Sequence, residues 1–159
     1  MSNANGWTLQ ETHNKLKSYY DGYHFSKGNM TDIYNPFSLI KALSSGNIQN
    51  FWASSGATTL LPKFVDHMEL RLKDFENCPI MPLTLETSDV TGGGPELFLY
   101  QCGYLTIKGT EGSVYRLGFP NEEVKQAIYE TVLPALTMRA EGIREIRGQV
   151  AELSVQIAE

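Results

Sequence analysis

Apolar residues recur at helical spacing near the start of the chain. Residues 9–20 are predicted to form a helix, because Thr8 and Glu11 make a T-x-x-E capping box at its start. Gly22, in the pair Asp21-Gly22, can take a left-handed conformation and end it. The predicted buried stripe of this helix consists of Leu9, His13, Leu16 and Tyr20.

A second helix is predicted to begin at Asn35 and Pro36, since asparagine is a favoured N-cap and proline fits the first helical position. The side chains expected to face inward from it are Phe37, Ile40 and Leu43. Residues 44–47 should end this helix, and residues 58–67 and 69–75 are predicted to be helical as well. The first half of the chain is therefore expected to form a helical body.

The pattern changes after residue 78. Residues 79–86 contain two prolines, which predicts an extended segment with an edge strand. A helix is expected at 96–102, and Gly103 should cap it. Strands are predicted at 104–108 and 113–117, joined by a turn at 109–112, and together they are the clearest hairpin in the sequence.

The last predicted helix of the body begins after Pro120, with Asn121 as its cap and with Glu122 and Glu123 in its first turn, where the helix dipole favours negative charge. Its inward stripe should comprise Val124, Ala127, Ile128, Val132 and Leu133. Pro134 should kink or end it near residue 131. Residues 141–158 carry a short a/d-like apolar stripe.

These elements predict an α+β fold that is mainly α with a small β-hairpin, arranged as a helical body with a winged-helix-like region. Residues 5–138 are expected to form this domain, and 139–159 a C-terminal amphipathic helix. Residues 1–4 include Ser-Asn-Ala, which matches a remnant of an expression vector.

Composition narrows the function classes. The chain has 159 residues and a formal net charge of −5, so a generic basic coat for nucleic acid is excluded. No run of 18 apolar residues predicts a membrane span, and no signal peptide is recognisable. Two cysteines without a zinc-ligand spacing favour free thiols in a cytoplasmic protein.

Candidate chemistry is sparse. Asp21, His24 and Asp32 lie within twelve residues and could tune an acid–base pair, although turn chemistry explains them equally well. The glycines at 92–94 precede a helix but lack the lysine of a phosphate loop. Residues 123–125 spell the E-x-K step of PD-(D/E)xK nucleases, yet they fall in a capped helix and are interpreted as its surface. The scattered histidines predict no metal site.

Four stretches carry a family resemblance. They are YDGYHF at 20–25, YNPFSL at 34–39, QCGYLTI at 101–107 and LGFPNEEV at 117–124. In this order and spacing the chain resembles the predicted AAA-ATPase-like family of bacteria over about residues 6–132. Members of that family resemble a P-loop ATPase domain followed by a helical, winged-helix-like lid, and many continue into a PD-(D/E)xK nuclease-like domain.

The resemblance implies a non-catalytic region between two active ones, since the Walker motifs would lie upstream and the nuclease motifs downstream. It therefore supplies no catalytic, cofactor-binding or metal-binding residue, and ATP and Mg²⁺ are expected only in a parent protein. The residues it offers as interface candidates are Tyr20, Asp21, Gly22, Tyr23, His24, Phe25, Asn35, Pro36, Trp52, Gly103, Tyr104, Pro120, Asn121 and Glu122.

Two functions follow. The first is a lid or adaptor that packs on an ATPase core, its own or another protein's, and mediates protein contacts. The alternative is a stand-alone winged-helix-like module that binds DNA or protein, although the acidic composition gives little reason to expect nucleic acid. The apolar stripe of the last helix would also permit a homo-oligomer, and no membrane partner is expected.

Overall fold

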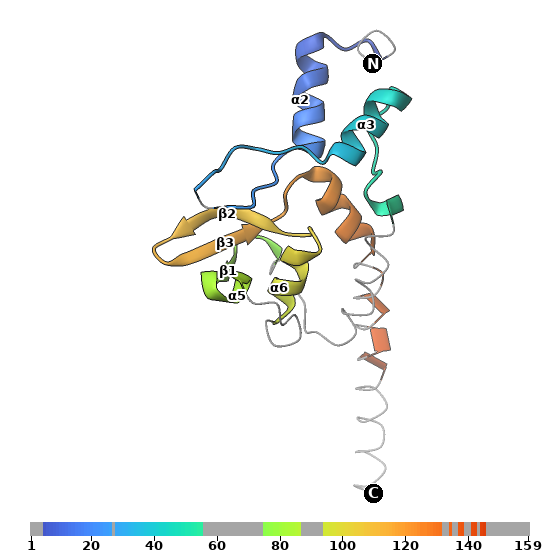
Figure 1. Cartoon of the computed structure of the whole chain (residues 1–159). Coiled ribbons are helices and arrows are strands. Elements are labelled where there is room, and N and C mark those ends of the chain that lie inside the picture. Colours follow the sequence, from blue (N-terminus) through green and yellow to red (C-terminus); the bar gives the residue numbers. More distant parts are fainter. Residues whose placement is uncertain are drawn as a thin grey trace, which may run out of the picture.

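The computed structural model describes residues 5–26, 28–55, 75–86 and 94–131, and single positions at 134, 137, 138, 141, 142, 144 and 145. The described chain combines helices with one small antiparallel sheet, which confirms the predicted mixture of α and β structure (Figure 1). Predictions for residues 1–4, the helices at 58–67 and 69–74, the glycine loop and the apolar stripe beyond 142 lie outside these residues.

The first helix, α2, spans Leu9–Tyr20 and begins with both halves of the predicted capping box. Its buried face differs from the prediction, because Leu9 and His13 are exposed while Thr12 is buried with Leu16 and Tyr20. The Thr12 hydroxyl donates to the Thr8 carbonyl oxygen at 2.9 Å, so its burial leaves no polar group unpaired. The N-terminal turn of α2 projects beyond the packed region, and Leu9 therefore meets solvent (Figure 1).

The second helix, α3, spans Pro36–Ser45, and the Asn35 side chain caps it by accepting from the backbone N–H groups of Phe37 and Ser38. The predicted inward face is wrong. Phe37, Ile40 and Leu43 are exposed, and α3 buries Ser38 and Ala42 instead. Ala42 packs in one cluster with Leu16 and Tyr20 of α2, and the partly buried Leu39 packs against the same cluster, so α3 contacts α2 through a different face from the predicted one.

The sheet has the strand order β1-β3-β2, with both pairings antiparallel. Strand β1 is Cys78–Ile80, β2 is Thr106–Glu111 and β3 is Val114–Gly118. The predicted hairpin is confirmed, but its turn is shorter than expected because β2 continues through residues 109–111. The predicted edge strand is confirmed at β1, which lies at the edge of the sheet and pairs with β3 on its inner side, and an edge strand is where a sheet tolerates a proline such as Pro79.

Two short helices flank the sheet. Residues 82–86 were expected to be extended, which is wrong: Pro82–Glu86 form helix α5. Pro82 occupies the first helical position, where its missing N–H removes no helical hydrogen bond. Helix α6 spans Gly94–Gln101, so it begins two residues and ends one residue earlier than predicted, and Gly103 has a positive φ just beyond it, as expected of a cap.

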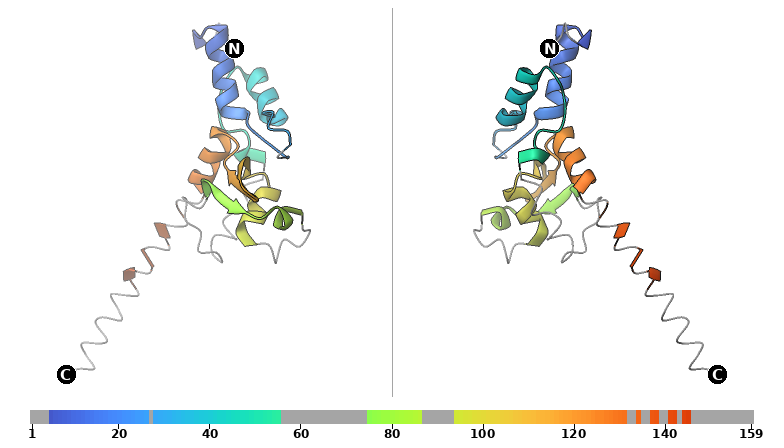
Figure 2. Two further views of the ribbon diagram at one scale, coloured as in Figure 1. Left: turned by 90° about the vertical axis from the view of Figure 1, so that its left-hand side faces the viewer. Right: turned by 90° about the vertical axis from the view of Figure 1, so that its right-hand side faces the viewer.

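Residues 122–131 form a helix that lies between the α2–α3 pair and the sheet, as two further views make plain (Figure 2). Asn121 caps it, accepting from the Val124 N–H at 3.1 Å, and the predicted inward residues Val124, Ala127 and Ile128 are fully buried. The remaining predicted inward positions, 132 and 133, lie outside the described residues. Residues 131, 134, 137 and 138 are helical, so the described residues do not show the predicted end of helical structure near residue 131.

The apolar core has two parts. The larger cluster joins the sheet, α6 and the helix at 122–131, and the smaller one joins α2, α3 and Phe51. Among the described residues, no helix is both long and apolar enough to cross a membrane. The candidate functional site described below lies at the junction between the two apolar clusters.

Candidate functional site

The four stretches that carry the resemblance are far apart in sequence but meet in space. The Asn35 N–H donates to the Tyr20 carbonyl oxygen at 2.8 Å, and this contact joins the first stretch to the second. The Tyr23 hydroxyl donates to the Gly103 carbonyl oxygen at 3.3 Å, joining the first to the third. The first and fourth stretches meet at residues 22 and 120, and these contacts define one junction.

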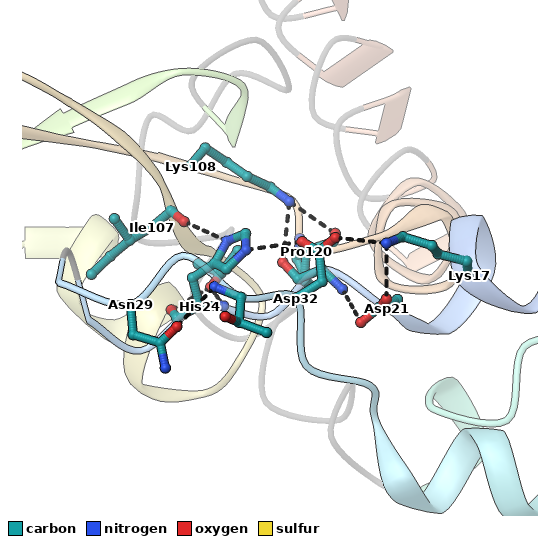
Figure 3. Close-up of polar contacts among 11 residues, drawn as sticks. Lys17, Asp21, His24, Asn29, Asp32, Ile107, Lys108 and Pro120 are labelled. Atoms are coloured by element: carbon teal, nitrogen blue, oxygen red, sulfur yellow. Dashed lines mark hydrogen bonds and ion pairs between the residues drawn. The ribbon is translucent and has the colours of Figure 1, made fainter.

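His24 is the centre of the polar contacts at this junction (Figure 3). The residue is 7% exposed, and its ring places Nδ1 2.9 Å from the Ile107 carbonyl oxygen and Nε2 2.9 Å from Asp32 Oδ1. The His24 backbone N–H donates to Thr106 Oγ1, and that hydroxyl donates to the His24 carbonyl oxygen, both at 2.7 Å. Both ring nitrogens face acceptors, so only a doubly protonated ring can donate to both.

Charged side chains on the solvent side of His24 interact with one another (Figure 3). Lys17 Nζ lies 3.1 Å from Asp32 Oδ2 and 3.7 Å from Asp21 Oδ2. The hydrogen bond from Lys17 lowers the pKa of Asp32, and the contact with His24 adds to that shift. His24 and Asp32 thus lie in contact, whereas Asp21 accepts from the Gly22 N–H of its own turn at 2.9 Å.

The first and fourth stretches pack backbone against backbone at Gly22. A Cβ atom added at Gly22 would lie 2.4 Å from the Pro120 carbonyl oxygen. Lys108 Nζ donates to the carbonyl oxygens of Gly22 at 3.2 Å and Pro120 at 2.9 Å, so one ammonium group bridges the two stretches (Figure 3). Burial lowers the pKa of Lys108.

Glu123 ties the helix at 122–131 to the segment after α3. Its Oε1 accepts from the backbone N–H groups of Phe51 at 2.9 Å and Trp52 at 3.0 Å, and the side chain is fully buried. The interpretation of residues 123–125 as helix surface is therefore wrong for Glu123, while Lys125 faces outward to Glu76, 3.1 Å away. Sequence reasoning missed Glu123 because an acid in a first helical turn usually faces solvent.

Three buried polar atoms near Glu123 have no hydrogen bond within the described part of the chain. They are Glu123 Oε2, Ser38 Oγ and Asn121 Nδ2. Burial raises the pKa of Glu123, and the nearby Ser38 hydroxyl and the two backbone N–H groups oppose that shift. Through Glu123, the N-terminus of this helix thus makes buried polar contacts with Ser38 of α3 and with the backbone of Phe51 and Trp52.

An aromatic hollow of about 360 Å³ opens beside the junction. Its lining residues are Tyr23, Phe25, Ile33, Tyr34, Asn35, Pro36, Trp52, Gln101, Cys102 and Gly103. The rings of Tyr23 and Phe25 stack at 6.1 Å, and Trp52 meets Tyr104 edge to face at 5.0 Å. None of the lining side chains is charged, so the hollow suits an uncharged apolar group.

The predicted interface residues divide into two groups. Those buried in the junction or core are Tyr20, Asp21, Tyr23, His24, Trp52, Tyr104, Pro120 and Asn121. Those at least partly accessible are Gly22, Phe25, Asn35, Pro36, Gly103 and Glu122. Their role in binding a partner stays a prediction. The described residues hold no group of three His, Cys, Asp or Glu side chains that could bind a metal.

Replacing His24 by alanine is expected to lower the free energy of unfolding by about 2 kcal/mol, because the Ile107 carbonyl loses its ring partner in a buried site. Asp32→Asn should cost less than about 1 kcal/mol, since the Asp32 side chain is 39% exposed. Urea unfolding of both variants checks the ranking. Equal losses would mean that the contact of His24 with Asp32, and not its contact with the Ile107 carbonyl, dominates.

Comparisons with known proteins give one similarity. The chain is 28% identical over 138 residues to an uncharacterised protein in the vnfD 5′ region of Azotobacter chroococcum mcd 1. The match covers 80% of this chain and 26% of the relative, so the chain spans about a quarter of that protein's length. No protein-family model matches the chain, and no solved structure matches it.

Proposed function

We propose that this chain is a non-catalytic lid or adaptor portion of an AAA-ATPase-like protein, which packs on an ATPase core and mediates protein contacts. The observation that carries the proposal is the orientation of α3. Phe37, Ile40 and Leu43, three residues apart on one face, are 46%, 62% and 55% exposed. The helix presents these three large apolar side chains to solvent, buries the small residues Ser38 and Ala42, and packs the partly buried Leu39 against the cluster shared with α2.

This orientation is the reverse of an ordinary surface helix, which turns its apolar stripe toward the core. Large exposed apolar patches on a folded protein commonly mark contact sites. Other exposed apolar side chains come from the same end of the chain, namely Leu9, Phe25, Met30 and Ile33. The proposal explains them together as the surface that an ATPase core would cover.

The contacts on the other face of α3 support a role in transmitting the binding of a partner to the sheet-bearing part of the chain. Ser38 on that face lies beside the buried carboxyl group of Glu123. Glu123 in turn holds the backbone of Phe51 and Trp52, and Trp52 packs on Tyr104 of the larger cluster. A partner bound to α3 would therefore act on residues that are in direct contact with the sheet-bearing part.

The order of α6, β2 and β3 is compatible with a winged-helix-like lid, a finer architecture that belongs to this proposal. The hairpin gives little support to the DNA-binding alternative. Lys108 donates to two carbonyl oxygens, and Arg116 donates to Glu111 within the hairpin. Both cations already have partners in the fold, whereas DNA binding needs cations that are available for phosphate contacts.

Hydroxyl-radical footprinting tests the proposed packing. In the isolated chain, Phe37, Ile40 and Leu43 should be oxidised readily, and in a parent polypeptide that includes the ATPase region they should be protected. Leu83 in α5, which is 78% exposed, is the internal control and should be oxidised equally in both.

Unchanged oxidation of the α3 residues in the parent would contradict the packing. A native gene without an upstream P-loop would contradict the ATPase assignment itself. The claim that the chain is non-catalytic has a separate test. The pure chain should release no phosphate from ATP in the presence of Mg²⁺, and measurable release would refute this claim.

A further inference from the structure

A second hollow, of about 550 Å³, lies between the C-terminal end of α2 and the helix that begins at residue 122. Its lining residues are Tyr19, Glu122, Lys125, Gln126, Tyr129, Glu130 and Pro134. None of them belongs to α3 or to the aromatic hollow. It is therefore a different surface from the one used in the proposed function.

Two tyrosine rings line this hollow, and both are held in place. The Tyr19 hydroxyl donates to Gln126 Oε1, which fixes the ring of α2 against the other helix. The Tyr129 hydroxyl donates to Glu76 Oε1 at 3.3 Å, and its ring meets Phe119 edge to face at 6.0 Å. Rings that are ordered before binding lose little conformational entropy when a ligand stacks on them.

The charges around the hollow do not balance. Lys125 Nζ lies 3.1 Å from Glu76 Oε1, so its charge is matched by a carboxylate outside the lining, and it lies over the Tyr129 ring at 5.8 Å from the ring centroid. Glu122 and Glu130 are both exposed. Within the described chain Glu122 makes no hydrogen bond or ion pair, and Glu130 only accepts from the Gln126 amide at 2.7 Å. Neither carboxylate therefore forms an ion pair among the described residues, and the electrostatic interaction of Glu122 with Lys125 is shared with the closer carboxylate of Glu76.

The negative field reaches the tyrosine hydroxyl on the opposite helix. Burial is the main cause of the raised pKa of Tyr19, and the carboxylates of Glu123, Glu130 and Glu122 add to it. A cation entering the hollow would be attracted by the same carboxylates. Geometry and charge thus favour the same class of ligand.

We infer that this hollow binds the guanidinium group of an arginine side chain presented by a protein partner. A guanidinium is planar, stacks on aromatic rings and donates in a fork that matches a carboxylate. Tyr19 and Tyr129 supply the rings, and Glu122 and Glu130 supply the acceptors. The mostly apolar walls favour this weakly hydrated cation over the compact ammonium group of lysine.

An NMR titration of the whole isotope-labelled chain tests this inference, with the peptide acetyl-Gly-Arg-Gly-Arg-Gly-amide as the probe at low ionic strength. Shift changes should concentrate at residues 19, 122, 126, 129 and 130. The double variant Glu122→Gln/Glu130→Gln should bind the peptide at least about tenfold more weakly, because it keeps the shape of the hollow and removes both charges.

The matched control is Glu141→Gln/Glu145→Gln, which removes two exposed carboxylates outside the hollow and should retain affinity within about twofold. Equal losses in the two double variants would overturn the inference in favour of general charge attraction. Two further probes are the same peptide with citrulline, a neutral analogue, or with lysine in place of both arginines. An equal affinity for the citrulline peptide, a tighter binding of the lysine peptide, or shift changes that are absent or map elsewhere would also overturn the inference. Far-UV circular dichroism of each variant verifies that it is folded.

Discussion

Replacing Gly22 by alanine is expected to lower the free energy of unfolding by about 3 kcal/mol or more, the sum of two separate penalties. Gly22 has a φ of +104°, which L side chains rarely adopt, so any Cβ strains the backbone. The added Cβ would also lie 2.4 Å from the Pro120 carbonyl oxygen. Since both atoms belong to backbone-fixed positions, the two stretches must separate, and the Lys108 bridge to Gly22 and Pro120 would weaken with them.

Gly46→Ala separates the two penalties. Gly46 also has a positive φ, +74°, but a Cβ added there meets nothing within 4 Å. Its replacement should therefore cost only the conformational strain, about 1 kcal/mol. Urea unfolding followed by circular dichroism gives both values. Similar losses at the two positions would show that the close approach at Pro120 contributes nothing.

Sequence patterns predicted the starts and ends of the helices better than their faces. The caps at Thr8, Asn35 and Asn121 depend on hydrogen bonds over three residues, so local sequence is enough to identify them. Which face is buried depends on what packs against the helix. The pattern around Ile40 is that of an ordinary amphipathic helix, yet the close contact of Ala42 with α2 turns the apolar stripe outward.

The candidate site shows the same contrast between contacts that are local in sequence and contacts that depend on long-range packing. His24 and Asp32 are eight residues apart, and their proximity in sequence made their contact a natural expectation. The partners Thr106 and Lys108 come from a strand more than 80 residues away, and their positions depend on the register of β2 against β3. A register shift between residues 107 and 109 sets where Lys108 lies, and no local pattern encodes it.

Replacing Glu123 by alanine is expected to lower the free energy of unfolding by about 2–5 kcal/mol. The change leaves the backbone N–H groups of Phe51 and Trp52 buried without an acceptor, and each such group costs about 1–3 kcal/mol. Glu123→Gln keeps an acceptor oxygen of the same reach and should retain most of the stability. A loss in the glutamine variant as large as in the alanine variant would mean that the charge, and not the acceptor, holds this segment.

The pH dependence of stability distinguishes the buried acid from its neutral analogue. Burial raises the pKa of Glu123 above its ordinary value of 4.5, so the folded protein binds this proton more tightly than the unfolded chain. The stabilisation from that proton is complete below the ordinary pKa and is lost as the pH rises through the folded-state pKa. Urea unfolding from acidic to neutral pH should therefore show wild type losing stability relative to Glu123→Gln, because other carboxylates such as Asp32 contribute equally to both proteins. A difference that stays constant across this range would mean that burial and the hydrogen bonds to Glu123 offset each other and leave its pKa unshifted. A wild type that gains stability relative to Glu123→Gln as the pH rises would mean that the N–H groups stabilise the charged carboxylate more than burial opposes it.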